Sequence, residues 1–189
     1  MVIHRSHSTV VEKIHKILDK EKFECSSYLS GQKESLRGPL YRDFILVFLG
    51  INQDKQERIL EISVTDLNPP LSASDQPKVS YYRIEFITEI VLDLEPFATT
   101  QLESLILFVN HVLDWPGFDL DELRGRVFYR YVWLVKESSI EGRAFTQLIG
   151  NLVMTLDLFE EMLKLVGEGK TSFDKLLEQV LELQKQTFS

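Results

Sequence analysis

The sequence predicts an α+β fold in which a mostly antiparallel sheet of about five strands packs against helices. Three observations lead to this class. Runs of apolar residues, alternating or continuous, predict several strands between residues 23 and 92. Apolar residues spaced three and four apart predict helices near both ends and in the middle of the chain. The strongest strand pattern, residues 126–135, stands between two of these helical segments.

A first helix is expected over residues 8–21. Ser8 or Thr9 would cap it, and Glu12 follows Thr9 by three residues, which is typical of a capping box. Its predicted buried stripe consists of Val10, Ile14, Ile17 and Leu18. The helix is short, so we expect its stability to depend on packing against the sheet.

Four strand patterns follow. Residues 23–29 predict a short edge strand, and residues 41–49 predict a strand buried on both faces because its apolar run is nearly continuous. Residues 59–65 alternate between apolar and polar side chains, and a short polar loop joins them to the preceding run, which predicts an antiparallel hairpin. Residues 81–92 alternate again, and the loss of phase after Ile87 indicates a bulge.

A proline-rich loop and a helix are predicted next to these strands. Residues 68–77 contain three prolines and predict a loop between the strands. A helix is expected over residues 99–114, capped by Thr99 or Thr100 and stopped by residues 115–117, which read Trp-Pro-Gly. Its predicted buried stripe consists of Leu102, Leu105, Ile106, Val109 and Val112.

The strand over residues 126–135 is rich in aromatic side chains on one face. That face carries Val127, Tyr129, Tyr131, Trp133 and Val135. The other face carries Arg126, Phe128, Arg130, Val132 and Leu134. Both faces hold enough apolar groups for a central strand, or for a strand with an interface on its outer side.

A long helix is predicted from Ser138 or Ser139 to residue 166. Gly167 and Gly169 would end it as a glycine C-cap. Its predicted stripe consists of Phe145, Leu148, Ile149, Leu152, Val153, Leu156, Phe159, Met162 and Leu163.

A last helix is predicted from Thr171 or Ser172 to residue 186. Its stripe consists of Phe173, Leu176, Leu177, Val180 and Leu181. A chain of 189 residues suits one core, so we expect a single α+β domain over residues 1–189, with residues 170–189 as a C-terminal helical extension.

Composition narrows the functional classes. The formal net charge is -8, which disfavours binding to a phosphate backbone. Cys25 is the only cysteine, so no intrachain disulfide forms, and the count fits a reducing cytoplasm. The first residues lack a signal-peptide pattern, and no apolar run approaches the ~20 residues of a membrane span. We therefore expect a cytoplasmic protein that binds neither nucleic acid nor membrane.

The sequence predicts no catalytic residue, no cofactor and no metal site. The four histidines, His4, His7, His15 and His111, follow no metal-binding motif. Cys25 has no neighbouring histidine in sequence and is interpreted as a small buried apolar residue, with a reactive thiol as the alternative.

Charged residues gather near a predicted turn. The acidic members are Asp114, Asp119, Asp121 and Glu122, and the basic ones are Arg124, Arg126 and Arg130, next to Tyr129 and Tyr131. Paired carboxylates can perform acid–base chemistry in a shielded cleft, and basic groups among aromatic rings can bind nucleic acid. A solvated turn and cross-strand ion pairs are the preferred interpretations, because the positive and negative charges cancel each other locally.

The order of elements carries a resemblance. The residues concerned are Leu102–Leu113 with Asn110, Phe118, Gly125–Tyr131, and the helix after Ser138 with Leu148, Leu152, Leu156 and Phe159. Over about residues 8–166 the pattern resembles the type III secretion chaperone-like fold, in its YbjN-like branch. That resemblance implies a non-enzymatic protein. Secretion chaperones are small, acidic, cytoplasmic dimers that hold an extended client segment against apolar grooves.

The predicted function is therefore that of a non-enzymatic protein-binding module, homodimeric, which binds a protein partner or client through apolar surface. The residues proposed for this contact are Tyr129, Tyr131, Trp133, Phe173 and Leu177. A small-molecule-binding or enzymatic domain with dispersed site residues is the alternative.

Overall fold

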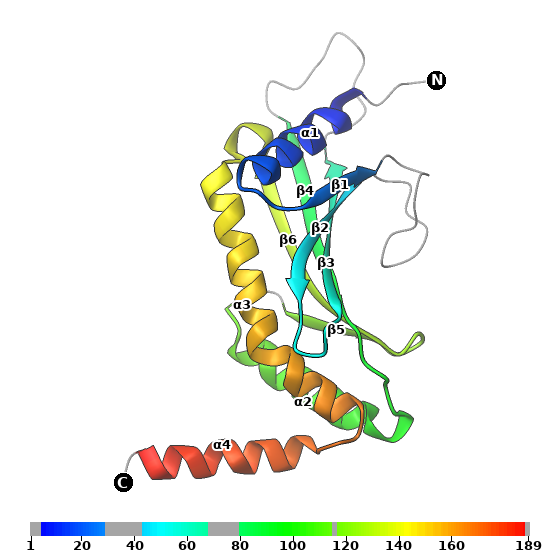
Figure 1. Ribbon diagram of the computed structural model, residues 1–189, viewed down its shortest axis with the longest axis vertical. Helices are drawn as coiled ribbons and strands as arrows, with labels where there is room; N and C mark the ends of the chain where they lie inside the picture. The colour runs from blue at the N-terminus through cyan, green and yellow to red at the C-terminus, as the bar shows by residue number, and fades with distance from the viewer. Residues whose placement is uncertain (1–4, 29–42, 68–79, 115–116, 188–189) are drawn as a thin grey trace. The chain divides into compact units, whose positions relative to one another are not determined.

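A computed structural model describes residues 5–28, 43–67, 80–114 and 117–187 (Figure 1). In this part of the chain the α+β prediction is confirmed: six strands form one sheet of order β1-β2-β3-β4-β6-β5, accompanied by four α-helices. The strands are β1 (Cys25–Tyr28), β2 (Phe44–Ile51), β3 (Glu57–Asp66), β4 (Tyr81–Ile90), β5 (Phe118–Asp121) and β6 (Arg126–Lys136). The helices are α1 (Arg5–Lys20), α2 (Thr99–Val112), α3 (Gly142–Gly167) and α4 (Phe173–Thr187), with short 3₁₀ turns η1 (Pro96–Ala98) and η2 (Glu137–Ser139).

Several sequence predictions concern residues that the structure does not describe. The proline-rich loop at 68–77, the Trp-Pro part of the stop signal at 115–116 and the first residues of the strand predicted from residue 41 lie outside the described residues.

The sheet has one strand more than the sequence indicated. The additional strand is β5, which pairs with β6 in an antiparallel hairpin, with Phe118 opposite Tyr129. Because β6 lies between β4 and β5, its prediction as a central strand is confirmed. The predicted hairpin of β2 and β3 is also confirmed, with Ile45 opposite Ile62. β1 ends the strand order, as expected of an edge strand.

The bulge predicted after Ile87 stays a prediction for the end of β4. β3 and β4 stay in register through the pair Leu60 and Thr88. A register shift does lie in β2, between Phe48 and Ile51. Gly50, between these two residues, has φ of 101°, a conformation that glycine adopts without steric cost.

The chain divides into two compact units. Unit 1 comprises Met1–Glu89 and Arg130–Met154, and unit 2 comprises Ile90–Tyr129 and Thr155–Ser189. Strand β6 and helix α3 therefore each contribute residues to both units. That the whole chain behaves as a single domain stays a prediction.

In unit 1, α1 packs on β1, β2 and β3 (Figure 1). The helix buries Val10, Ile14 and Leu18 as predicted, whereas Ile17 is half-exposed. The helix already begins at Arg5, so the predicted cap at Ser8 or Thr9 is wrong.

Aromatic rings from α3, β4 and β6 pack together in the core of unit 1. The first half of α3 contributes Phe145, whose ring lies 5.4 Å from that of Phe86 on β4 and 6.3 Å from that of Trp133 on β6. Phe86 also contacts Tyr131 at 5.9 Å between ring centroids. The predicted aromatic face of β6 thus packs inward in this unit.

In unit 2, α2 buries the four first members of its predicted stripe, Leu102, Leu105, Ile106 and Val109. The fifth member, Val112, is exposed, because the helix ends there rather than at residue 114. The cap predicted at Thr99 or Thr100 is also wrong. The helix continues directly from η1, so Ala98 precedes it and no side chain caps it.

The ends of α3 and α4 can be compared with the caps that the sequence predicts. α3 begins at Gly142 instead of Ser138 or Ser139, because η2 and the extended Ile140 intervene. Its predicted glycine C-cap is confirmed: the helix ends at Gly167, and Gly169 has φ of 67°. For α4 the predicted cap is confirmed, since Ser172 Oγ accepts a hydrogen bond from the backbone N–H of Lys175 at 3.2 Å.

Candidate functional site

The five residues predicted for partner binding do not form one surface patch within either unit. Tyr131 and Trp133 belong to unit 1 and are half-buried against the aromatic core. Tyr129 belongs to unit 2 and is only 3% exposed, edge-on to Phe118, so it offers a partner little surface. Phe173 and Leu177, on α4 in unit 2, are half-exposed. A partner-binding role for these residues stays a prediction.

A more exposed apolar surface lies on α2. Leu107 is 71% exposed and Val112 is 54% exposed, and Phe108 and His111 are exposed between them. We call Leu107, Phe108, His111 and Val112 the α2 outer face. In the sequence, this face corresponds to a second apolar stripe beside the buried one. The prediction missed it because it assigned only one apolar stripe to the helix.

Helix α4 extends this surface within unit 2. The ring of Phe173 lies 5.7 Å from that of Phe108. The backbone N–H of Phe173 donates to Oε1 of Gln101 on α2 at 3.0 Å, which fixes the start of α4 beside α2. Leu176 and Leu177 on the following turn are half-exposed, so apolar area continues from α2 onto α4.

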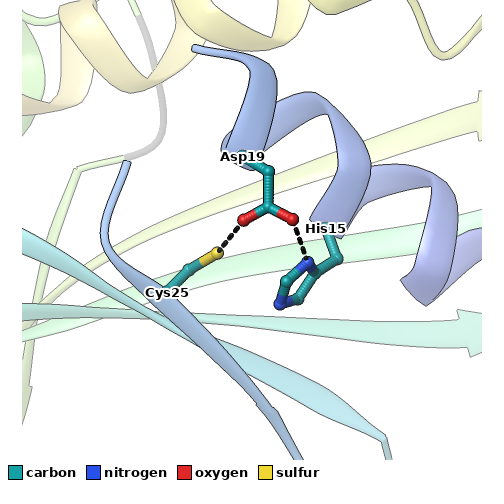
Figure 2. Close-up of polar contacts among 3 residues, drawn as sticks. All are labelled: His15, Asp19 and Cys25. Atoms are coloured by element: carbon teal, nitrogen blue, oxygen red, sulfur yellow. Dashed lines mark hydrogen bonds and ion pairs between the residues drawn. The ribbon is translucent and has the colours of Figure 1, made fainter. Parts of the chain in front are cut away.

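A second candidate site combines three side chains of different chemistry in unit 1. His15 and Asp19 lie four residues apart on α1, and Cys25 is the first residue of β1 (Figure 2). The backbone reverses between them: Lys22 has φ of 64°, and the N–H of Phe23 donates to the carbonyl of Leu18 at 3.0 Å. This tight reversal returns the chain to the last turn of α1.

Pairing within the sheet then orients the thiol. Cys25 lies opposite Val47 in the register with β2, and Val47 is part of the buried face. The N–H of Phe48 donates to the carbonyl of Glu24 at 2.9 Å, which anchors the strand just before the cysteine. The sulfur is thus directed toward α1, as Figure 2 shows.

Asp19 stands between the other two groups. One carboxylate oxygen is 3.0 Å from Nδ1 of His15, and the other accepts from the Cys25 sulfur at 3.8 Å. Burial, and then the charge and hydrogen bond of Asp19, raise the pKa of the Cys25 thiol to about 11. At neutral pH the thiol is therefore protonated.

This order of groups does not suit nucleophilic catalysis. A nucleophilic cysteine needs a neighbouring cation or base that stabilises the thiolate, whereas here an aspartate is the thiol's hydrogen-bond partner. An imidazole nitrogen, a carboxylate oxygen and a sulfur are, however, all ligands for divalent transition metals. These three donor atoms lie within 4.8 Å of one another.

Sequence inspection missed the cluster because the spacing of histidines and the lone cysteine were considered separately. The available signal was the pair His15 and Asp19 at helical spacing, followed by Cys25 at the start of the next strand. Only the backbone reversal at Lys22 brings the three together.

A polar groove also lies in unit 1, between α1 and the first half of α3. Its volume is about 570 Å³, and Lys20, Glu21, Arg143 and Gln147 are among its lining residues. Charges of both signs line it, so it has no clear preference for one class of ligand.

The charged residues near β6 have structural partners. Arg130 approaches Glu85 of β4 at 3.7 Å, which confirms cross-strand ion pairing at this position. The guanidinium of Arg126 lies over the ring of Phe128. In the turn of the β5–β6 hairpin, Arg124 pairs with Asp121 at 3.1 Å, at an exposed position.

Comparisons of the chain with protein-family models, with curated proteins and with solved structures give no match. Among the described residues, no helix is both long enough and apolar enough to cross a membrane. The candidate sites above therefore rest on their own geometry.

Proposed function

We propose that this protein is a cytoplasmic, non-enzymatic protein-binding module, built on the type III secretion chaperone-like, YbjN-like pattern that its sequence resembles. Its first partner is a second copy of the same chain, bound through the α2 outer face. The observation that carries this proposal is the exposure of Leu107, Phe108 and Val112 side by side on one helix. Contiguous exposed apolar residues mark interaction surfaces in soluble proteins.

Charge supports a second copy as the occupant. The chain has a net charge of -8, so two copies repel each other over most of their surfaces. The α2 outer face carries no acidic residue. By contrast, the exposed Leu158 on α3 is accompanied by the exposed acidic residues Asp157 and Glu161. The α2 outer face is therefore an exposed apolar surface on which two acidic chains can meet.

The arrangement of α2 is also self-complementary. A two-fold contact presents the same patch twice, so residues equally far before and after the centre face each other. With two antiparallel α2 helices centred on Leu107, the half-exposed Glu103 faces His111 of the partner subunit. An acidic group then meets a basic group on both sides of an apolar centre.

One helix alone is too narrow for a stable interface, which buries about 1,200–2,000 Å² in total. Helix α4 supplies further area, because Phe173 packs beside Phe108, and Leu176 and Leu177 follow on its half-exposed side. The predicted contact residues Phe173 and Leu177 thus belong at the edge of the proposed interface.

The test is the oligomeric state, measured by sedimentation equilibrium over a range of concentrations. Wild-type protein is expected to be a dimer. Leu107→Glu is expected to raise the dimer dissociation constant by roughly 30-fold or more, because a central interface residue commonly contributes about 2 kcal/mol or more. Two like charges would then meet at the two-fold centre.

Leu158→Glu is the matched control. Leu158 is 60% exposed, also on a helix of unit 2, and is outside the α2 outer face. The control is expected to remain dimeric. A monomeric wild-type protein would overturn the proposal, and so would equal dissociation of the two variants.

A further inference from the structure

The cluster of His15, Asp19 and Cys25 has the composition of a metal site. The three side chains offer a nitrogen, an oxygen and a sulfur, and each comes from a residue type that binds zinc in proteins. Two of them project from neighbouring turns of α1, and the third from β1, so a rigid helix and a paired strand hold the donors. We propose that these three residues bind a divalent transition-metal ion of the zinc type.

The distances between the donor atoms suit such an ion. A tetrahedral zinc ion with bonds of about 2.0–2.3 Å keeps its ligand atoms roughly 3.3–3.8 Å apart. The His15 nitrogen and the Asp19 oxygen are 3.0 Å apart, and the Cys25 sulfur is 3.8 Å from the other Asp19 oxygen. All three donor atoms lie within 4.8 Å of one another, so side-chain rotations are needed for them to bind one ion.

The donor set also selects the kind of ion. Thiolate and imidazole ligands favour zinc and similar transition metals, whereas calcium and magnesium prefer oxygen ligands alone. With three protein ligands, the fourth tetrahedral position is left to water, since Asp19 is exposed to solvent. Binding releases the thiol proton, because sulfur coordinates as the thiolate.

The contact between His15 and Asp19 does not by itself indicate a metal site. The pair of His15 and Asp19 alone is common on helix surfaces. What distinguishes this cluster is that the second oxygen of the same carboxylate is turned to the only thiol of the chain (Figure 2). The contact joins two elements that the reversal at Lys22 holds together.

The single cysteine makes the test specific. Co²⁺ replaces Zn²⁺ as a spectroscopic probe, and a cobalt–thiolate bond produces a charge-transfer absorption in the near ultraviolet. Titration of the metal-free, reduced full chain with Co²⁺ is expected to develop this band and to saturate at one ion per chain. Zn²⁺ is expected to displace Co²⁺ and to slow modification of Cys25 by a thiol reagent.

Variants assign the ligands. Cys25→Ser should abolish the charge-transfer band. His15→Gln and Asp19→Asn should each weaken Co²⁺ binding by at least the roughly 10–100-fold that loss of a group hydrogen-bonded to a ligand costs. Circular dichroism checks that each variant is folded; the His15 side chain is half-exposed and the Asp19 side chain is exposed.

His7→Gln is the control, because it also removes one histidine of α1 but lies more than two helical turns before His15. It should bind Co²⁺ as wild type does. Three results would overturn the proposal: cobalt binding without the charge-transfer band, thiol modification unaffected by Zn²⁺, or equal effects of His7→Gln and His15→Gln.

Discussion

One side chain, Asn110, joins α2 to β5 in unit 2. Its Nδ2 donates to the carbonyl oxygen of Phe118 at 2.8 Å, and its Oδ1 accepts from the N–H of the same residue at 2.8 Å. Phe118 is buried, so water replaces these bonds poorly. The chain passes so close that a Cβ on Gly117 would lie 1.9 Å from Asn110 Oδ1, which requires glycine there.

Asn110→Ala is expected to lower the free energy of unfolding by about 1–3 kcal/mol, because it leaves a buried donor and a buried acceptor unsatisfied. Urea denaturation measures the change. Gln147→Ala is the control: its Nε2 donates to Asn151 at an exposed position, and we expect a change within about 0.5 kcal/mol. Equal losses for the two variants would contradict the bridging role of Asn110.

The limits of sequence inspection are clearest at this scale. Periodicity correctly predicts most of the buried residues of α1 and α2, because burial follows the helical repeat, but it wrongly includes Ile17 and Val112. It cannot predict that Asp19 meets Cys25, since this contact depends on the backbone of a two-residue reversal. Nor does it separate Tyr129 from a surface tyrosine, because Tyr129 packs on Phe118 of β5, a strand that the sequence did not predict.

Within α3, an ion pair is buried on the helix face of unit 2. Lys164 Nζ lies 3.0 Å from Glu160 Oε1, and the two side chains are only 6% and 7% exposed. Removing one partner of a buried pair leaves the other charge in a poorly solvated place. Lys164→Ala is therefore expected to lower the free energy of unfolding by about 3–5 kcal/mol, measured by urea denaturation.

Two further variants test the cause. The double variant Glu160→Gln with Lys164→Met removes both charges and keeps much of the volume, so it should recover most of the loss. Lys170→Ala removes a more exposed partner of Glu168 and should cost less than about 1 kcal/mol. A double variant as unstable as Lys164→Ala would show that lost packing, not an uncompensated charge, is responsible.

Among the elements, strands were predicted better than helix starts. The long strands contain runs of apolar and aromatic residues, which fix their place in the sheet. β5 was missed because its four residues, Phe-Asp-Leu-Asp, carry two acids and look like a turn without their partner β6. The N-cap of α2 was misjudged because Pro96 opens a 3₁₀ turn that leads directly into the helix.

At the scale of the whole molecule, the fold class followed from the order of strand and helix patterns. The division into two units did not, because no composition shift or linker separates them in sequence. Their boundaries fall at the end of β4, inside β6 and inside α3, between residues 89 and 90, 129 and 130, and 154 and 155. Contacts distant in sequence define the units, and a local pattern contains no information on them.

Shared elements make independent unfolding costly. If unit 2 unfolds, β6 and α3 lose the residues that unit 2 holds, and the parts left in unit 1 become free ends. Helices and strands gain stability cooperatively along their length. We therefore expect the two units to unfold together, as the prediction of a single domain requires.

Native-state hydrogen exchange in low denaturant tests this coupling. Lys164→Ala perturbs unit 2, and the slowest amides of β3 report on unit 1 while those of α2 report on unit 2. If the two units unfold together, the slowest amides of β3 and of α2 both report the global free energy of unfolding. The free energies measured at both sets should then fall equally, by about 3–5 kcal/mol. Lys170→Ala should leave both nearly unchanged. A drop in α2 with β3 unaffected would mean that the units unfold separately, because a local perturbation would then stay within its own unit.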